Sequence, residues 1–590
     1  MLTTLTPEQA LPIKQAITVK LDHLMASYVD PDLKSSTARD FEAGTFTIDG
    51  SPALAAHLVI EAVQEHHKTA QLGDGTVSIE TYEDFERLLS PETATADKTR
   101  IERHNLLHSR YAPATQASYV QYVRDCLVEA FGNEGMAGYN PFTAKQRYVI
   151  SETASRRHTL ITTGSGQGKT TLLKRIAYHY AENYPETCLI ILDPHRDLAP
   201  EVARHQPDPL HASDDTTPDF EGRLIYIDPH PTDGFQAVLN PLDVPLTSYD
   251  DAIVAAEKLT GAYRRILGKE ITFNTYPLLQ SCITALLLME DTSPEDLLSF
   301  MCDDRDPVTD KPRNQTLYET ALQLLPATER QYRLLKERFH SHAFKASKAS
   351  LLNHLEQAML SPTFRRFSTG RSTFDLFESI AAQKILVFNL DQQKLGQQTS
   401  CAIGQHIMAL VQFYSRSMLR AEFAPKHPIH LIAEDAHEFI SDTTREFLAE
   451  PRRYGLSFTF SSQGIDPFPD SIKTALSNIQ VLLAGHNTDP KTVNFNTHRL
   501  NGVTKDDIRA TRAFQFHAQK HFSQPSMLVQ AHPCQNQSID DEAWTARLAA
   551  QHEQYYRKAD APILVSDLRQ QARKGKPPGD QKPFDPPKWD

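Results

Sequence analysis

The chain of 590 residues carries 74 Asp and Glu against 61 Lys and Arg, a formal net charge of −13, and 40% of its residues are hydrophobic. This length predicts roughly two to four domains, and the composition is that of a globular protein. The sequence shows no apolar run near the roughly 18 residues of a membrane span and no secretory signal, so we expect a cytoplasmic protein without membrane insertion. Its cysteines are scattered without a CxxC pair, which argues against a zinc module or a disulfide framework.

Residues 1–135 are expected to form a separate, helix-rich accessory domain. Amphipathic stretches such as IKQAITVKLDHLMASYV support helices there. Residues 1–150 hold 13 Lys and Arg against 20 Asp and Glu, an unfavourable surface for DNA. We therefore expect this domain to dock a protein partner or to support oligomerisation.

From about residue 136 the sequence alternates short apolar strands with helical patterns. Such strands with helical crossovers predict a mostly parallel sheet with helices on both faces, an α/β fold. The predicted core spans 136–250 and 376–535, interrupted by a helical insertion at 251–375 and followed by a mobile polar tail at 536–590. The expected strands are 158–162, 188–193, 223–228, 384–390, 429–435, 456–463 and 481–486.

The stretch ITTGSGQGKTT, residues 161–171, matches the phosphate-loop pattern GxxxxGK[ST] except that Thr163 replaces the first glycine. Lys169 would supply a positive charge to the β- and γ-phosphates of a nucleotide, and the Thr170 hydroxyl would ligate Mg²⁺. The alternative interpretation is a glycine-rich strand-to-helix turn with an accidental GKT. The predicted nucleotide-binding residues are Gly164, Ser165, Gly166, Gln167, Gly168, Lys169, Thr170 and Thr171.

The insertion holds a basic segment. Residues 305–371 contain twelve Lys and Arg against six acids, with interleaved aromatic residues. This pattern suits a surface that follows a nucleic-acid backbone, although a solvated helix face with core aromatics would give the same pattern. The candidate DNA contacts are Arg330, Arg333, Lys336, Arg338, Arg365 and Arg366.

An apolar strand in PIHLIAEDAHEFI, residues 428–440, ends in two adjacent acids. By position, Glu434 is the metal-side carboxylate and Asp435 the one that activates water. The usual order in such motors is Asp then Glu, so the division of labour between the two stays open. Acids in the first turn of a helix are the alternative interpretation.

Further polar candidates follow in the sequence. Gln463 ends an expected strand and could contact both the γ-phosphate and the attacking water. Arg452 and Arg453 precede that strand, and either could act in a neighbouring subunit, because a guanidinium keeps its charge and fits a phosphate. Capping of a helix C-terminus is the alternative for both arginines.

Six motifs in order resemble the HerA/FtsK superfamily of DNA-pumping ATPases over about residues 140–533. The motifs are TGSGQGKT, LIILDPHRDLAPEV, RLIYIDP, KILVFNLDQQKLGQQTS, LIAEDAHEFI and RRYGLSFTFSSQ. The closest likeness is to type IV secretion coupling ATPases and HerA-like translocases. The resemblance implies a RecA-like core, a homohexameric ring, ATP with Mg²⁺, and movement of DNA through a central channel. Lys169 and Thr170 match the family's phosphate-loop pair, Glu434 and Asp435 its acidic pair, Gln463 its polar sensor, and Arg452 its basic position. The chain departs from the family in lacking the N-terminal membrane helices common in coupling ATPases and the N-terminal β-barrel of HerA proteins.

The leading hypothesis is therefore an ATP-driven DNA translocase. A second hypothesis is a nucleotide-switched assembly or docking ATPase of a secretion or phage-defence complex. The reversed acidic pair, the missing barrel and the acidic N-terminal region favour it. A motor for protein cargo is the third hypothesis and would share the same site.

Overall fold

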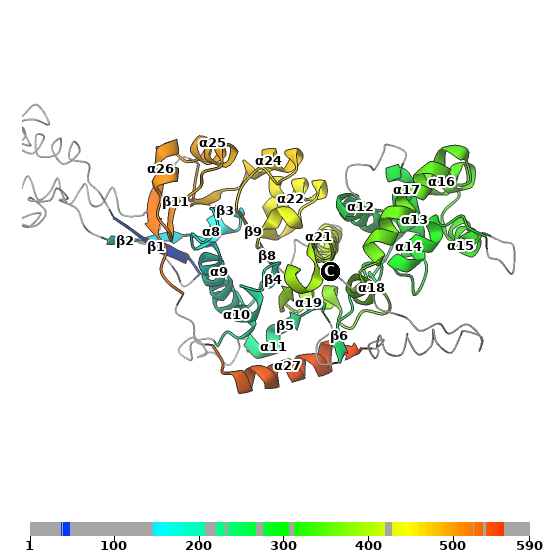
Figure 1. The fold of residues 1–590 in the computed structure, drawn as a ribbon, viewed down its shortest axis with the longest axis horizontal. Coiled ribbons are helices and arrows are strands. Elements are labelled where there is room, and N and C mark those ends of the chain that lie inside the picture. The colour runs from blue at the N-terminus through cyan, green and yellow to red at the C-terminus, as the bar shows by residue number, and fades with distance from the viewer. Residues whose placement is uncertain are drawn as a thin grey trace, which may run out of the picture. The chain divides into compact units, whose positions relative to one another are not determined.

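The computed structural model describes residues 37, 39–47, 145–206, 220–230, 234–266, 275–305, 312–418, 428–522, 524, 526–534 and 538–559. The chain divides into two compact units. The first unit comprises 1–184, 448–452 and 456–535, and the second comprises 185–447, 453–455 and 536–590. Figure 1 shows the elements of both units.

The first unit is built on strands in the order β2-β1-β12-β11-β10-β3-β9. The strand β3 (Thr159–Thr162) pairs in parallel with β9 (Leu456–Ser462) and with β10 (Val481–Ala484). The remaining strands join in antiparallel pairs. They are β1 (Phe41–Thr47), β2 (Lys145–Ile150), β11 (Gln515–Gln519) and β12 (Met527–Gln530).

Helices complete the first unit. Among the described residues of this unit the longest is α9 (Lys169–Asn183), which follows β3 and buries one apolar face that includes Leu172, Leu173 and Ile176. The others are α8 (Glu152–Ser155), α24 (Asp470–Leu476), α25 (Pro490–Arg499) and α26 (Lys505–Ala510). Two short helices, α22 (Arg445–Ala449) and α23 (Pro451–Tyr454), lie where the chain changes units.

The second unit contains four parallel strands in the order β8-β4-β7-β5. All four are fully buried, as expected for strands covered on both faces. They are β4 (Cys188–Asp193), β5 (Leu224–Ile227), β7 (Ile385–Asn389) and β8 (Ile429–Ala433). A separate pair joins β6 (Phe235–Gln236) to β13 (Arg557–Lys558).

The described residues between 249 and 368 of the second unit are largely helical. Figure 1 shows α13 to α17 grouped together in green. The helices of this region are α12 (Tyr249–Ile266), α13 (Thr275–Leu287), α14 (Pro294–Met301), α15 (Gln315–Leu324), α16 (Arg330–Arg338), α17 (His342–Met359) and α18 (Pro362–Ser368). The rest of the unit adds α10 (Ala199–Ala203), α11 (Phe220–Arg223), α19 (Leu376–Ala381), α20 (Gln392–Leu395), α21 (Gln397–Met418), two 3-10 turns, η3 (Ala436–Glu438) and η4 (Asp442–Thr444), and α27 (Asp541–Tyr555).

The prediction of an α/β, RecA-like fold is confirmed. All seven strands expected from the sequence are present, and each pairs in parallel with another of the seven. Within the described residues, no helix is both long and apolar enough to cross a bilayer.

The N-terminal region differs from its expected helical character in the one segment that the structure describes. Residues 41–47 form β1, which pairs with β2 and β12. Gly44 allows this pairing, because a Cβ at that position would lie 2.1 Å from the carbonyl oxygen of Gln530. The rest of the predicted accessory domain at 1–135 lies outside the described residues, so its docking role stays a prediction.

Part of the expected mobile tail at 536–590 forms a helix instead, α27, whereas residues 560–590 lie outside the described part of the chain. The strand β5 has a free edge, and side chains at the end of α27 cover it. The Gln551 side chain bonds the backbone N–H of Tyr226 and the carbonyl of Leu224, at 2.9 and 3.0 Å. The Tyr556 hydroxyl accepts from the Asp228 N–H at 2.7 Å and donates to the Tyr226 carbonyl at 3.0 Å. These side chains bond the backbone groups that a further strand would otherwise pair with, and the same bonds hold α27 against the edge of the sheet.

A buried histidine in α21 should make the stability of the second unit depend on pH. The ring of His406 stacks on Phe364 and meets Tyr263 edge-on, and burial lowers its pKa to about 4. A histidine whose pKa falls on folding stabilises the fold above its unfolded pKa, and this stability is lost as the pH falls from about 6.5 toward 4. Denaturant unfolding should show the wild type losing about 2 kcal/mol more than His406→Leu between pH 7.5 and 5. Parallel pH dependences of the two proteins would contradict this.

Candidate functional site

The phosphate loop of the first unit has the backbone that anion binding requires. It connects β3 to α9, and its glycines Gly166 and Gly168 adopt φ values of 73° and 95°. Only glycine adopts such values without strain. Gly168 is the N-cap of α9 and makes no side-chain cap hydrogen bond, and the N–H groups at the start of a helix are the groups that bind anions.

Thr163, which departs from the phosphate-loop pattern, is fully buried between the neighbouring strands. Its N–H donates to the carbonyl of Ser462 at 3.3 Å, and its hydroxyl donates to the carbonyl of His486 at 3.3 Å. A Cβ at Gly485 would lie 2.4 Å from the Thr163 hydroxyl oxygen, so this second glycine makes room for the threonine. Thr163 therefore anchors the end of β3 to the neighbouring strands, and the phosphate loop begins directly after it.

The predicted nucleotide-binding residues are accessible. Ser165 and Gly166 are exposed, and the other members of the set are half-buried, a mixture expected for a loop that closes around a ligand. The N–H groups at the start of a helix, a lysine and threonine hydroxyls suit a triphosphate with Mg²⁺, because phosphate accepts from N–H groups and Mg²⁺ prefers oxygen donors. The residues of the loop thus fit a nucleoside triphosphate with Mg²⁺, the ligand that the sequence predicts.

Gln463 comes directly after Ser462 of β9, the strand that pairs with β3. Its side chain is exposed, and its backbone carbonyl accepts from the Asn487 side chain at 2.8 Å. Because Ser462 bonds Thr163 at the start of the loop, Gln463 lies at the edge of the sheet from which the phosphate loop leaves. This is the placement that a polar sensor would need.

The acidic pair lies in the second unit, directly after β8. Glu434 is 1% exposed, and its N–H donates to the carbonyl of Leu192 in the adjacent β4 at 3.1 Å. Asp435 is 4% exposed and has a φ of 44°. Aspartate tolerates this left-handed conformation better than most residues, and such strain is frequent at functional sites.

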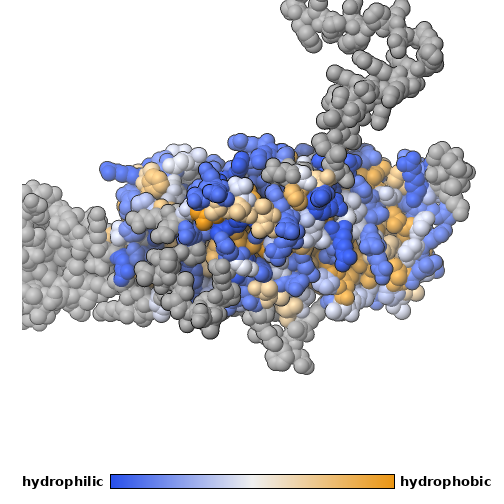
Figure 2. All heavy atoms as spheres, turned by 90° about the horizontal axis from the view of Figure 1, so that it is seen from below, coloured by the Kyte–Doolittle hydropathy of each residue, from blue (hydrophilic) through white to orange (hydrophobic). Residues whose placement is uncertain are grey.

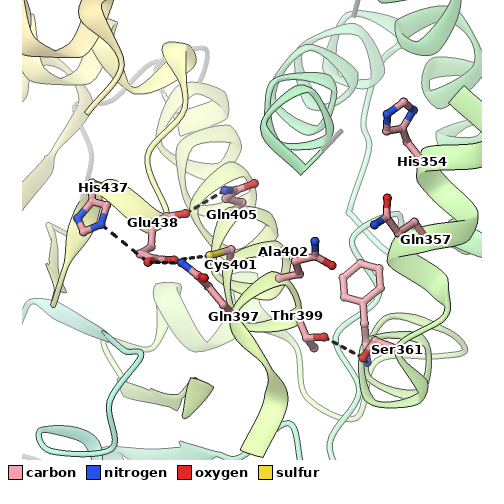
Figure 3. Close-up of a pocket in the computed structure, with 12 residues that line it drawn as sticks. His354, Gln357, Ser361, Gln397, Thr399, Cys401, Ala402, Gln405, His437 and Glu438 are labelled. Carbon is pink, nitrogen blue, oxygen red and sulfur yellow. Dashed lines mark hydrogen bonds and ion pairs between the residues drawn. The ribbon is translucent and has the colours of Figure 1, made fainter. Parts of the chain in front are cut away.

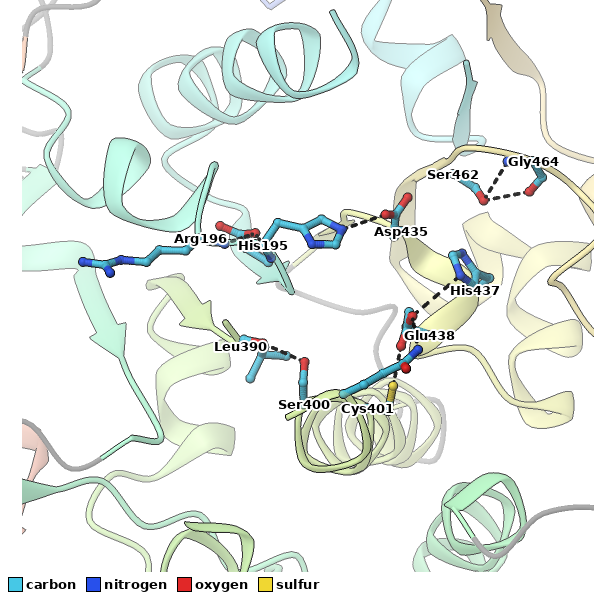
Figure 4. Close-up of polar contacts among 12 residues, drawn as sticks. His195, Arg196, Leu390, Ser400, Cys401, Asp435, His437, Glu438, Ser462 and Gly464 are labelled. Atoms are coloured by element: carbon cyan, nitrogen blue, oxygen red, sulfur yellow. Dashed lines mark hydrogen bonds and ion pairs between the residues drawn. The ribbon is translucent and has the colours of Figure 1, made fainter. Parts of the chain in front are cut away.

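Asp435 has a partner that the sequence did not single out. The Nε2 atom of His195 lies 2.7 Å from the Oδ2 atom of Asp435, as Figure 4 shows. His195 belongs to the DPHRD segment that follows β4. The carboxylate of Asp193 fixes this segment by accepting four backbone N–H groups, those of His195, Arg196, Leu198 and Ala199. Burial raises the pKa of Asp193, and these N–H groups oppose that shift.

A cavity of about 370 Å³ lies beside the turn that follows the acidic pair (Figure 3). Cys401 donates to Glu438 at its wall, and Gln397 donates to the same carboxylate at 3.1 Å. Gln405 donates to the Glu438 carbonyl at 2.9 Å. These contacts tie η3, the turn that follows the acidic pair, to α21.

The two candidate arginines lie in α23, one in each unit. Arg453 is exposed, and its guanidinium carbon lies 5.8 Å from the centre of the Tyr454 ring. The side chain of Arg452 falls outside the described residues. A role for either as a residue that acts in a neighbouring subunit remains a prediction.

All six candidate DNA contacts are exposed and lie on two helices of the second unit, α16 and α18. The interleaved aromatics behave differently. Phe339, Phe344 and Phe367 are buried, with at most 2% exposure, so they belong to the core and do not offer a face to bases. Tyr332 on α16 is the exception, since it is half-buried. The surface therefore provides mainly charge, which suits contact with phosphates.

Comparisons with known proteins give remote structural matches. No protein-family model and no curated protein matches the chain. The bacterial conjugative coupling protein TrwBdeltaN70 is similar with 14% identity, over 66% of this chain and 88% of that chain, at a TM-score of 0.47. Plasmid coupling protein TrwB in complex with ADP and Mg²⁺ is similar with the same identity and shares, at a TM-score of 0.46. VirB4 of Thermoanaerobacter pseudethanolicus is similar with 14% identity, over 64% of this chain and 90% of that chain, at a TM-score of 0.39. At such identities and TM-scores, function has to be argued from the residues of this chain.

Proposed function

We propose that the chain is an ATP-driven motor that moves DNA and works as a homohexamer. The observation that carries this proposal is the strand–loop–helix unit β3–α9, in which two left-handed glycines lead into Lys169 and Thr170 at the start of α9. This geometry is made for the phosphates of a nucleotide. The order of the six sequence motifs supports the assignment to a motor.

The residues of the site take the following roles. The N–H groups of the loop and the Lys169 ammonium bind and orient the phosphates. The Thr170 hydroxyl and the Glu434 carboxylate would hold Mg²⁺, which would neutralise negative charge on the phosphates. Asp435 accepts the proton of the attacking water, and the Gln463 amide orients that water. Arg452 or Arg453 contributes positive charge to the site of a neighbouring subunit.

The steady-state rate of ATP hydrolysis, with and without single- and double-stranded DNA at low salt, tests this function directly. Stimulation by DNA supports a DNA motor and identifies its preferred track. Hydrolysis that ignores both forms of DNA would overturn the DNA part of the proposal and leave an ATPase with another cargo.

The exposed face of α16 should carry part of the DNA affinity. The double variant Arg333→Ala, Lys336→Ala removes two charges from this face, whereas Lys505→Ala, Arg509→Ala removes two exposed charges from α26 as a matched control. Each lost phosphate contact lowers the slope of log affinity against log salt by about 0.9. We expect a loss of about two in this slope for the first variant and none for the control. Equal slopes for all three proteins would exclude α16 as a DNA contact.

A nucleotide-switched assembly ATPase is the second candidate, and one observation favours it. The proposed water-activating carboxylate of Asp435 is buried and engaged by His195. An enzyme whose carboxylate is held in this way would hydrolyse ATP slowly until another event released the carboxylate from the histidine. Slow hydrolysis that responds to a protein partner and not to DNA would support this candidate over the motor.

A further inference from the structure

An exposed aromatic ring packs against the phosphate loop. The large hydrophobic side chains exposed in the described residues are few, and Figure 2 shows hydrophobic residues scattered among hydrophilic ones on the face that it draws. The large hydrophobic side chains that are exposed are Leu324, Leu360, Phe514, Phe522 and Leu528. Phe514 is 41% exposed and belongs to the first unit, as the loop does.

The contact between Phe514 and the loop is close. A Cβ at Gly168 would lie 2.6 Å from the Cδ1 atom of the Phe514 ring and 3.1 Å from Cε1. Gly168 therefore has two reasons to be glycine, its left-handed backbone and the ring beside it. One part of the ring covers Gly168 while the remainder stays open to solvent.

The backbone holds the ring in this place despite strain. Phe514 has a φ of 62°, a conformation that bulky residues rarely adopt. Its N–H donates to the carbonyl of Gln167 at 2.9 Å, which ties it to the loop itself. Its carbonyl accepts from the Ala531 N–H at 2.8 Å and from the Gln530 side chain at 3.2 Å. Strained residues that are fixed from several sides are concentrated at ligand sites.

We propose that the exposed face of Phe514 stacks on the purine base of the bound nucleotide. The inference rests on the proposed function, because it requires the triphosphate to lie on the loop. A nucleotide whose phosphates bind the N–H groups of the loop must place its sugar and base beyond the start of α9, within reach of a ring that touches Gly168. A flat aromatic face attracts a nucleobase by stacking, and a purine offers the larger surface.

A structural role alone does not account for the ring. An aliphatic side chain could cover Gly168 equally well, and burial would favour a position with less than 41% exposure. The stacking role instead predicts that the ring matters for nucleotides with a base and is indifferent to phosphates alone. The effect of changing Phe514 should therefore report the part of the binding free energy that comes from the base and leave the part that comes from the phosphates unchanged.

Calorimetric titration of the full chain in Mg²⁺ with ATP, CTP and inorganic tripolyphosphate tests the proposal. The variants are Phe514→Leu, which keeps apolar cover over Gly168 without an aromatic face, and Phe514→Tyr, which keeps the face. Stacking contributes on the order of tenfold in affinity per base. We expect Phe514→Leu to bind ATP about tenfold more weakly, to lose most of the preference for ATP over CTP, and to bind tripolyphosphate as the wild type does. Phe514→Tyr should match the wild type with all three ligands.

Two results would overturn the stacking role. One is unchanged ATP affinity in Phe514→Leu. The other is an equal loss of ATP and tripolyphosphate affinity, which would make Phe514 a support for the loop backbone. Failure of the proposed function is a separate result, in which the wild type binds neither ATP nor tripolyphosphate. The melting temperature of each variant confirms that it is folded before binding is compared.

Discussion

Lys169→Ala should lower ATP hydrolysis by about 100- to 1000-fold, because it removes a positive charge aimed at the phosphates where negative charge develops. Lys169 is the first residue of α9 and directly follows the left-handed Gly168, so its side chain starts at the mouth of the loop. ATP affinity should fall as well, by about tenfold, since a charge-assisted hydrogen bond to the bound phosphates is lost. Hydrolysis assays and calorimetric titration measure the two effects.

Lys174→Ala is the matched control for this variant. Lys174 lies further along the same helix and outside the loop, so its removal changes the net charge equally. Its hydrolysis rate should stay near that of the wild type. Near-normal turnover in Lys169→Ala would show that the loop does not hold the reacting phosphates and would remove the central assignment of the site.

The sequence predicted the parallel strands and missed the antiparallel ones for a physical reason. The parallel strands β4, β5, β7 and β8, together with β3, β9 and β10, are buried along their whole length and are therefore largely apolar in sequence. In β11 the half-buried Gln515 and His517 alternate with buried residues, and β12 contains an exposed Leu528. Such short, partly polar strands resemble loops in sequence. The strand β1 was missed because its pairing partners lie about 100 and 480 residues away in the chain.

The residues of the candidate site also fall into those that the sequence revealed and those that it did not. Glycines, the lysine and the acids have roles that depend on local backbone geometry, so a motif reveals them. The pairing of His195 with Asp435 joins residues that are 240 positions apart, and the contact of Phe514 with Gly168 joins residues that are still further apart in the chain. Neither residue type signals its partner in the sequence. The basic segment misled in another way, because Phe339, Phe344 and Phe367 serve the core, as does Lys348, one of its twelve basic residues.

Asp435→Asn should bind ATP normally and hydrolyse it about 100- to 10,000-fold more slowly, the range expected when a general base is lost. Asparagine is the informative replacement because it tolerates a positive φ, so the left-handed backbone at 435 is kept. It also keeps the size of the side chain next to His195. Alanine would add backbone strain to the chemical change. Hydrolysis and ATP affinity, measured on the same preparation, separate the chemical step from binding.

The comparison with Glu434→Gln assigns the roles of the reversed pair. If Glu434 ligates Mg²⁺ as proposed, its variant should need more Mg²⁺ for half-maximal hydrolysis, whereas Asp435→Asn should show the wild-type Mg²⁺ dependence at a much lower rate. Glu438→Gln provides a control carboxylate in the adjacent 3-10 turn and should keep the rate near that of the wild type. Full turnover in Asp435→Asn together with a rate collapse in Glu434→Gln would move the water-activating role to Glu434. The pairing of Asp435 with His195 would then serve to shape the turn after β8, since a buried carboxylate in a left-handed conformation needs a partner to stay there.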